Sequence, residues 1–150
     1  YQKLQQYCAG KYRNFVLHKG YFDQTLTPEF LDSLKTKPPI LVWIDCDYYT
    51  SAKIVFERLK DYLPNGCVVY FDEPEFNYGS RYTGEARLIH EINTGIYGEG
   101  SEMVPDLALS LNLRRVYRYI NIHAASGYER LEKINVADEL HKRGNDSPFP

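Results

Sequence analysis

The stretch LVWIDCDYYTS, residues 41–51, contains an apolar run that ends in two aspartates one residue apart, Asp45 and Asp47. Continuous apolar runs of this length are typical of strands buried on both faces of a parallel sheet. ILVWID, residues 40–45, therefore predicts such a strand. Because a carboxylate is costly inside a buried strand, we expect the aspartates at its carboxyl end, the edge where open α/β sheets bind ligands.

A helix and a second strand are predicted after this stretch. SAKIVFERLKDYL, residues 51–63, has apolar residues at helical spacing. These are Ala52, Val55, Phe56, Leu59 and Leu63. Asn65-Gly66 predicts a turn, and CVVYFDE, residues 67–73, predicts a second buried strand that again ends in acids, Asp72 and Glu73.

Two strands joined by one helix are expected to be parallel and adjacent, with carboxyl ends about 4.8 Å apart. Asp45, Asp72 and Glu73 would then crowd together. Neighbouring carboxylates repel unless a cation lies between them, and Mg²⁺ prefers such oxygen ligands. We interpret the three as candidate magnesium ligands and Asp47 as a candidate general base beside a metal-bound hydroxyl. The alternative, that these acids cap a helix or accept loop N–H groups, stays open.

The segment before these strands predicts two helices and a strand. Residues 2–12 predict a short helix, and NFVLHKG, residues 14–20, predicts a strand that ends at its glycine. TPEFLDSLK predicts a helix with Thr27 as N-cap and Pro28 at the first helical position.

The segment after these strands predicts a helix at residues 85–95, an antiparallel strand pair at 106–111 and 114–123, and a last helix around Tyr128–Leu140. The alternation of strands and helices predicts an α/β fold. We expect a Rossmann-like, mostly parallel sheet with helices on both faces and a C-terminal antiparallel strand pair.

The composition narrows the class of protein. The 150 residues include 18 basic and 20 acidic side chains, for a net charge of −2, which does not suit a nucleic-acid partner. No apolar run approaches the roughly 20 residues of a transmembrane helix, so we expect no membrane partner. Cys8, Cys46 and Cys67 form no CxxC pair, which favours reduced thiols in a cytoplasmic protein over zinc or a disulfide scaffold.

Several enzyme classes place D-x-D after an apolar strand. Phosphatases of the haloacid dehalogenase type use DxDxT, but here Thr50 comes one position late. Glycosyltransferases use DxD to hold a metal on a nucleotide-sugar, which fits Asp45 and Asp47 but leaves Asp72 and Glu73 unexplained. A metal-dependent glycosyltransferase stays open as an alternative.

IDCDYYTSAKIVFERLKDYLPNGCVVYFDE, residues 44–73, resembles the macrocin-type O-methyltransferases, a class I S-adenosylmethionine-dependent family. Upstream, HKGYFDQTL at residues 18–26 is similar to the family's G-x-F-x-x-T-L element. Downstream, FNYGSRYTGEARLIHEI at residues 76–92 is similar to its substrate loop and following helix. The resemblance spans roughly residues 14–95, with four elements in order.

The resemblance implies that Asp45, Asp72 and Glu73 hold Mg²⁺ and that Asp47 deprotonates a hydroxyl of a sugar or other polyhydroxylated metabolite. Glu73 stands where the family often has a second aspartate. The implied cofactor is S-adenosyl-L-methionine, bound here by Gly20, Tyr21 and Asp45. Aromatic faces and polar donors near the acidic tips suit a polyol substrate; the candidates are Tyr49, Asn77, Arg81 and Tyr82.

The family's Gly-rich cofactor loop and the strand after it have no counterpart before residue 14. We therefore expect residues 1–150 to be one partial methyltransferase domain, the C-terminal part of the fold without its first two strands, with a frayed tail at 144–150. Such a piece exposes apolar strand edges, so we expect it to fold poorly or to form a homo-oligomer. A truncated domain without catalytic activity also stays open.

Overall fold

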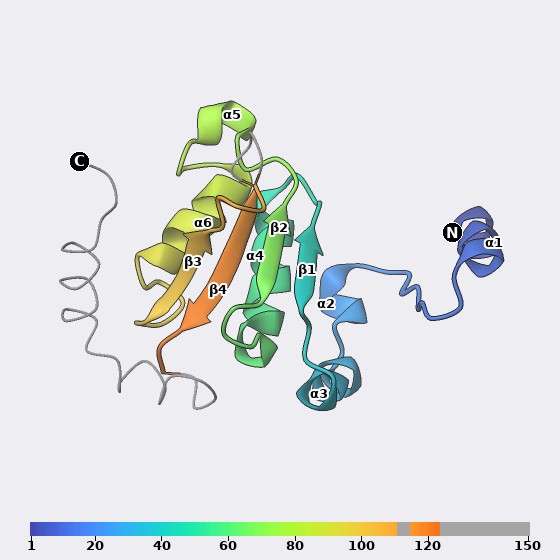
Figure 1. The fold of residues 1–150 in the computed structure, drawn as a ribbon. Coiled ribbons are helices and arrows are strands. Elements are labelled where there is room, and N and C mark those ends of the chain that lie inside the picture. The colour runs from blue at the N-terminus through green and yellow to red at the C-terminus, as the bar shows by residue number, and fades with distance from the viewer. Residues whose placement is uncertain (111–114, 124–150) are drawn as a thin grey trace, which may run out of the picture.

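The computed structural model describes residues 1–110 and 115–123, which form an α/β fold with an open, mixed four-stranded sheet (Figure 1). The strands lie in the order β1-β2-β4-β3. Their bounds are Leu41–Ile44 (β1), Val68–Phe71 (β2), Ser101–Pro105 (β3) and Val116–Asn121 (β4).

β1 and β2 are parallel neighbours, with pairs running from Leu41 and Val68 to Ile44 and Phe71. β4 is antiparallel to both β2 and β3. The expectation of a mostly parallel sheet is therefore wrong, since one of the three strand pairs is parallel. The physical reason is that the segment at 14–20, predicted as a further strand, does not join the sheet, so β1 and β2 form its one parallel pair among the described residues. The expected antiparallel pair, β3 and β4, makes up the other half of the sheet.

Two helices cover one face of this sheet, as Figure 1 shows with both behind the strands. They are α4, Tyr49–Leu59, continued by the 3₁₀ turn Lys60–Tyr62, and α6, Gly84–Asn93. α4 packs against α6, and α6 packs against β3. The predicted stripe is confirmed for its four residues on α4, which are all buried. Leu63 is buried as well, but it follows the 3₁₀ turn in an extended conformation, so the predicted helix ends before it. These buried residues meet inward-facing sheet residues that include Ile44, Val69, Phe71, Met103, Tyr117 and Tyr119.

The other face of the sheet is open in the part of the chain that the structure describes. Leu41 is 51% exposed and Trp43 is 60% exposed, and the Trp43 ring lies 4.0 Å from the ring of Tyr70 between centroids. The predicted strand at 40–45 is confirmed. The predicted burial of both of its faces is wrong, and so is the prediction that helices cover both faces of the sheet, as far as the described residues show. β1 is one of the two edge strands of this sheet. Its alternate residues Leu41 and Trp43 are exposed, while Ile44 on the opposite face is buried in the core.

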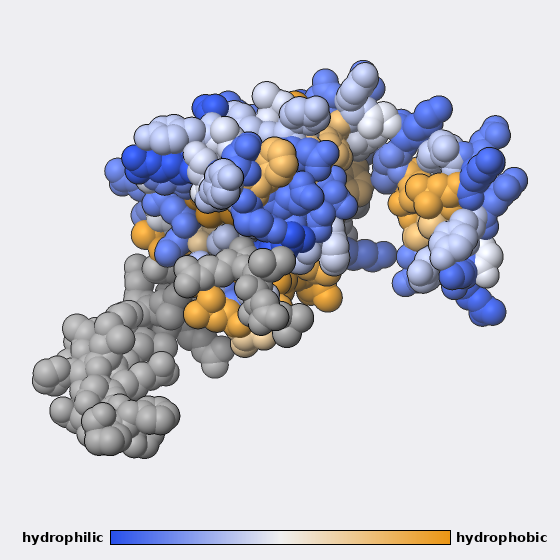
Figure 2. Space-filling model, turned by 90° about the horizontal axis from the view of Figure 1, so that it is seen from above, coloured by the Kyte–Doolittle hydropathy of each residue, from blue (hydrophilic) through white to orange (hydrophobic). Residues whose placement is uncertain are grey.

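The N-terminal segment forms helices and no strand. The helix at 2–12 is confirmed as α1, Gln2–Lys11, which has no buried residue and stands apart from the sheet (Figures 1 and 2). The strand at 14–20 is wrong, because that segment pairs with no described strand and leads instead into α2, Phe22–Thr25. An extended segment without a ladder partner is not a strand, whatever its propensity.

α3, Pro28–Thr36, begins where the sequence predicts. The Thr27 side chain accepts a hydrogen bond from the Phe30 N–H at 3.3 Å, and Pro28 occupies the first turn. The N-cap prediction is confirmed.

The C-terminal strand pair is confirmed in kind and wrong in position. Its first strand is β3 at 101–105, not 106–111. Residues after β3 turn instead, because the Asp106 carboxylate accepts the N–H groups of Ala108 and Leu109, both at 3.1 Å. The predictions for residues 111–114, the helix at 128–140 and the tail at 144–150 lie outside the described residues.

None of the helices within residues 1–110 and 115–123 has the length and apolar character needed to cross a membrane.

Candidate functional site at the carboxyl edge of β1 and β2

The two acidic strand ends meet at one edge of the sheet. Ile44 and Phe71 form the last pair of the parallel ladder, and the Asp72 N–H donates to the Ile44 carbonyl at 3.0 Å. Asp45 and Asp72 therefore follow residues that are directly paired. The prediction that these strands are parallel and adjacent is confirmed. Seen from above, this end of the molecule presents mainly hydrophilic residues (Figure 2).

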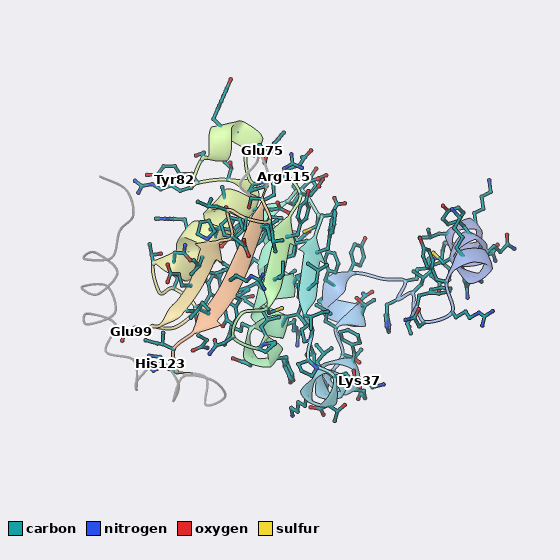
Figure 3. All side chains as sticks on the ribbon, viewed as in Figure 1. Lys37, Glu75, Tyr82, Glu99, Arg115 and His123 are labelled. Atoms are coloured by element: carbon teal, nitrogen blue, oxygen red, sulfur yellow. The ribbon has the colours of Figure 1, made fainter. Side chains whose placement is uncertain are left out.

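Asp72 has a cationic partner of its own. Its carboxylate accepts a hydrogen bond from the Tyr70 hydroxyl at 3.1 Å and forms an ion pair with Arg115 at 3.4 Å. Arg115 also donates to both carboxylate oxygens of Glu75 (Figure 3). The bonds to Glu75, and after them the bond to the Tyr70 hydroxyl, raise the pKa of Arg115, so the guanidinium stays charged. Arg115 therefore neutralises part of the acidic edge.

Glu85 is a fourth carboxylate at this edge, in the first turn of α6. It is 2% exposed, and its Oε2 accepts the Glu73 N–H at 3.1 Å. Its Oε1 is buried without a hydrogen-bond partner among the described residues. Burial raises the pKa of Glu85 to about 7. The hydrogen bond from the Glu73 N–H lowers this pKa, while the negative charges of Asp72, Asp45 and Glu73 raise it further.

Cys46 lies between the two aspartates of the D-x-D motif and packs against the core. Burial raises the pKa of its thiol to about 11, and the nearby negative charges of Glu85, Asp47 and Asp45 add to that rise. The thiol therefore stays protonated near neutral pH. A protonated thiol is neither a good nucleophile nor a good metal ligand.

The donors at this edge fit Mg²⁺ in type, because all are carboxylate oxygens and one buried oxygen lacks a partner among the described residues. Their side chains are not arranged as a formed site. Within residues 1–110 and 115–123, no three His, Cys, Asp or Glu side chains are grouped so that they could hold a metal ion. The Arg115–Asp72 ion pair also occupies one predicted ligand.

Asp47 lies in a strained loop beside the start of α6. Its φ of +50° is in the left-handed region, which is uncommon for a residue other than glycine. The Asp47 carbonyl oxygen lies 3.8 Å from the point where a β carbon on Gly84 would stand. The β1–α4 loop and the α6 N-terminus therefore approach each other closely, which places Asp47 in the same neighbourhood as Glu85.

Asp47 lines a cavity of about 560 Å³ above the acidic edge. The other side chains in it are mainly aromatic and polar and come from three segments. They include Tyr49, Glu73, Phe76, Asn77 and Thr83. Of the predicted residues, this cavity brings together the candidate base, one candidate ligand and two candidate substrate residues, Tyr49 and Asn77.

Tyr49 and Asn77 are both held by other side chains. The Tyr49 hydroxyl donates to Glu91 at 2.6 Å, within the contact between α4 and α6. The Asn77 amide donates to the Thr83 hydroxyl at 3.3 Å, and Asn77 has a positive φ of 51°. Asn77 belongs to α5, Phe76–Gly79, a short turn beside the cavity.

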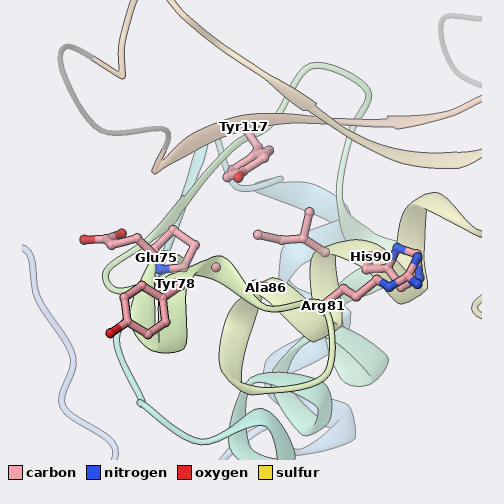
Figure 4. A pocket seen from close by; sticks show the side chains of 9 residues that line it. Glu75, Tyr78, Arg81, Ala86, His90 and Tyr117 are labelled. Atoms are coloured by element: carbon pink, nitrogen blue, oxygen red, sulfur yellow. The ribbon is translucent and has the colours of Figure 1, made fainter.

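Arg81 and Tyr82 do not line this cavity. They contact each other through a hydrogen bond from the Arg81 guanidinium to the Tyr82 hydroxyl at 3.1 Å. Arg81 lines a second cavity of about 530 Å³. Figure 4 shows it, with Glu75, Tyr78, Ala86, His90 and Tyr117 among the lining residues.

The predicted cofactor residues are not enclosed. Gly20 and Tyr21 are exposed residues just before α2, and they line neither cavity. Asp45 is also exposed and lines neither cavity. Neither of these two cavities therefore joins the three positions.

Sequence reasoning missed Glu85 and Glu91, two buried acids on α6. Glu91 accepts hydrogen bonds from Tyr49, from Tyr97 at 3.0 Å and from Arg87 at 2.8 Å. Burial acts against it, but these bonds keep the pKa of Glu91 below its usual value. The signal for Glu85 was weak, since an acid in the first turn of a helix ordinarily complements the helix dipole on the surface.

Comparison with protein-family models, with curated proteins and with solved structures finds no match to this chain. Its function must therefore be inferred from the geometry of the acidic edge and from the sequence motifs.

Proposed function

We propose that this chain contributes the acidic edge of an S-adenosylmethionine-dependent, Mg²⁺-assisted O-methyltransferase that acts on a hydroxyl of a sugar or other polyhydroxylated metabolite. The register of β1 and β2 supports it most. Ile44 and Phe71 form the last pair of this ladder, and Asp45 and the Asp72-Glu73 pair come directly after them. The position of Asp47 in an open cavity beside Glu73 adds to it.

In this proposal Asp45, Asp72 and Glu73 hold the cation. When bound, Mg²⁺ supplies positive charge that lowers the pKa of a neighbouring hydroxyl. Asp72 must then exchange its ion pair with Arg115 for the cation. Arg115 keeps a partner in Glu75 after that exchange, so the loop after β2 stays attached to β4.

Asp47 acts as the general base in this proposal. It lines the cavity, where an acceptor hydroxyl has access, and a carboxylate within hydrogen-bond reach can take up its proton. The exposed ring of Phe76 and the polar groups of Asn77 and Thr83 offer a stacking face and hydrogen-bond partners. That mixture suits a polyol.

The cofactor part of the proposal is supported by the sequence motifs alone. Gly20, Tyr21 and Asp45 are its candidate residues, and all three are exposed and line neither of the two cavities described above. The cofactor supplies the methyl group on a positively charged sulfur.

The cation site can be tested by calorimetric titration of Mg²⁺ into the 150-residue chain. We compare the wild type with Asp72→Ala and with Asp61→Ala, an exposed acid on the 3₁₀ turn after α4 that serves as matched control. We expect Asp72→Ala to weaken binding at least about tenfold and Asp61→Ala to leave it unchanged. Equal binding by all three proteins contradicts the proposed site.

Ligand binding separates the proposal from its rival. Affinity for S-adenosylhomocysteine supports methyl transfer. Mg²⁺-dependent binding of a nucleotide-sugar, without affinity for S-adenosylhomocysteine, supports a glycosyltransferase that uses Asp45 and Asp47.

A further inference from the structure

Glu85 is a buried carboxylate whose environment leaves one oxygen unused. The side chain is 2% exposed, and none of the ion pairs among the described residues involves it. Oε2 accepts the Glu73 N–H, while Oε1 is buried without a partner in this part of the chain. A buried carboxylate that lacks compensation is strongly unfavourable, so its presence calls for an explanation.

The helix dipole explains only part of this arrangement. Glu85 lies in the first turn of α6, where a negative charge gains about 0.3–1 kcal/mol from the helix N-terminus. An exposed acid would gain the same interaction without the cost of burial. The dipole therefore does not account for an oxygen that has lost its water and found no donor among the described residues.

The neighbouring charges increase the need for compensation. Asp45, Asp72 and Glu73 all act on Glu85 as negative charges. The one cation paired with this group in the described residues is Arg115, which bonds to Asp72 and Glu75 and forms no ion pair with Glu85. Of these four carboxylates, only Asp72 has a cationic partner among the described residues, and the buried one has none.

We propose that Glu85 is the buried member of the cation site at this edge, and that its free Oε1 helps to hold the cation, either directly or through a cation-bound water. Its other oxygen holds the backbone of Glu73, so the same side chain positions a predicted ligand. This inference rests on the cation site of the proposed function and extends it to a residue on α6.

Glu91 provides a matched control on the same helix. It is also buried, but Tyr49, Tyr97 and Arg87 satisfy its carboxylate. Glu91→Gln therefore disturbs a buried acid on α6 without touching the acidic edge. A general effect of damaging α6 would appear in this variant as well.

The test is a calorimetric titration of Mg²⁺, repeated with Mn²⁺, into the wild type, Glu85→Gln and Glu91→Gln. We expect Glu85→Gln to weaken cation binding about 10- to 100-fold, while Glu91→Gln binds as the wild type does. Wild-type affinity in Glu85→Gln overturns this inference and leaves the proposed site standing. Absence of binding by the wild type overturns both.

A measurement on the wild type covers the case in which Glu85→Gln does not fold. Carboxyl ¹³C signals of labelled glutamate are followed as substoichiometric Mn²⁺ is added. We expect the Glu85 signal to broaden well before that of Glu91, because paramagnetic broadening falls steeply with distance. Equal broadening of the two signals overturns the inference.

Discussion

Asp47 and Glu85 are unusual carboxylates for two different reasons, one in its backbone and the other in its burial. Asp47 has an exposed side chain on a left-handed backbone, and residues other than glycine that adopt such backbone often occur at functional sites. Glu85 is buried with one oxygen unsatisfied by the described residues. The first was predicted from its spacing after Asp45. The second became visible only when the fold brought the α6 N-terminus to the loop after β2.

Asp47→Asn removes the proposed base and keeps the size of the side chain. In the proposed methyltransferase, we expect turnover to fall about 10²- to 10⁴-fold. Cation affinity should stay within about threefold of the wild type, since Asp47 is not a proposed ligand. Methyl-transfer rates and calorimetry measure the two quantities. Undiminished turnover excludes Asp47 as the base.

Arg115→Gln frees Asp72 from its ion pair. If Asp72 is a ligand, the cation no longer competes with the guanidinium, and Mg²⁺ affinity should rise severalfold in calorimetry. Arg118→Gln is the control, because Arg118 lies on β4 three residues after Arg115 and pairs with Asp106 instead. Unchanged or weaker Mg²⁺ binding by Arg115→Gln shows that Asp72 is not a ligand.

The raised pKa of Glu85 makes stability depend on pH. Its pKa is about 7 in the folded chain against an ordinary 4.5, so the folded state binds the proton more tightly than the unfolded state. The free energy of unfolding therefore falls as pH rises from about 4.5 to 7, by up to about 3 kcal/mol. Urea unfolding across this range measures it. Glu85→Gln should lack this loss, and the same slope in both proteins contradicts the assigned pKa.

At the scale of elements, the sequence predicted what depends on local pattern. The α4 stripe, the α3 cap at Thr27 and the β1–helix–β2 unit were all predicted, because periodicity and capping chemistry act over a few residues. The strand at 14–20 was wrong, since a strand exists only when another strand pairs with it, and that partner is a property of the whole sheet.

Tyr49 on α4 and Glu91 on α6 join these two helices through a side-chain hydrogen bond of 2.6 Å. Tyr49→Phe removes the donor and leaves a buried carboxylate with one partner fewer. We expect the free energy of unfolding to fall by about 1–3 kcal/mol in urea titrations. Tyr48→Phe, at an exposed neighbouring position, should change it by less than about 0.5 kcal/mol. Equal effects contradict a structural role for the Tyr49 hydroxyl.

At the scale of the whole molecule, the described sheet ends in a strand with an open edge and an uncovered apolar face. β1 is one of the two edge strands, and its Leu41 and Trp43 are more than half exposed. Open apolar edges favour pairing with another chain. Which face of the sheet is covered depends on packing between segments far apart in the sequence. The continuous apolar pattern of residues 40–45 therefore could not show which face would be covered.

We therefore expect the 150-residue chain to self-associate through β1. Sedimentation velocity over a concentration series should show a rising average mass, and Leu41→Lys should reduce it by placing a charge at the edge. Leu107→Lys, a matched change of an exposed leucine in the turn after β3, should not. A compact monomer at all concentrations contradicts this expectation.

Crystals grown with Mn²⁺ would show through their anomalous difference density whether the two strand ends share a cation. We expect one strong peak at the carboxyl edge, bound by carboxylates from both strand ends, Asp45 after β1 and Asp72 or Glu73 after β2, with Arg115 released from Asp72. A peak bound by one strand end alone, or a manganese-free edge with the Arg115–Asp72 pair intact at saturating Mn²⁺, would contradict the shared site.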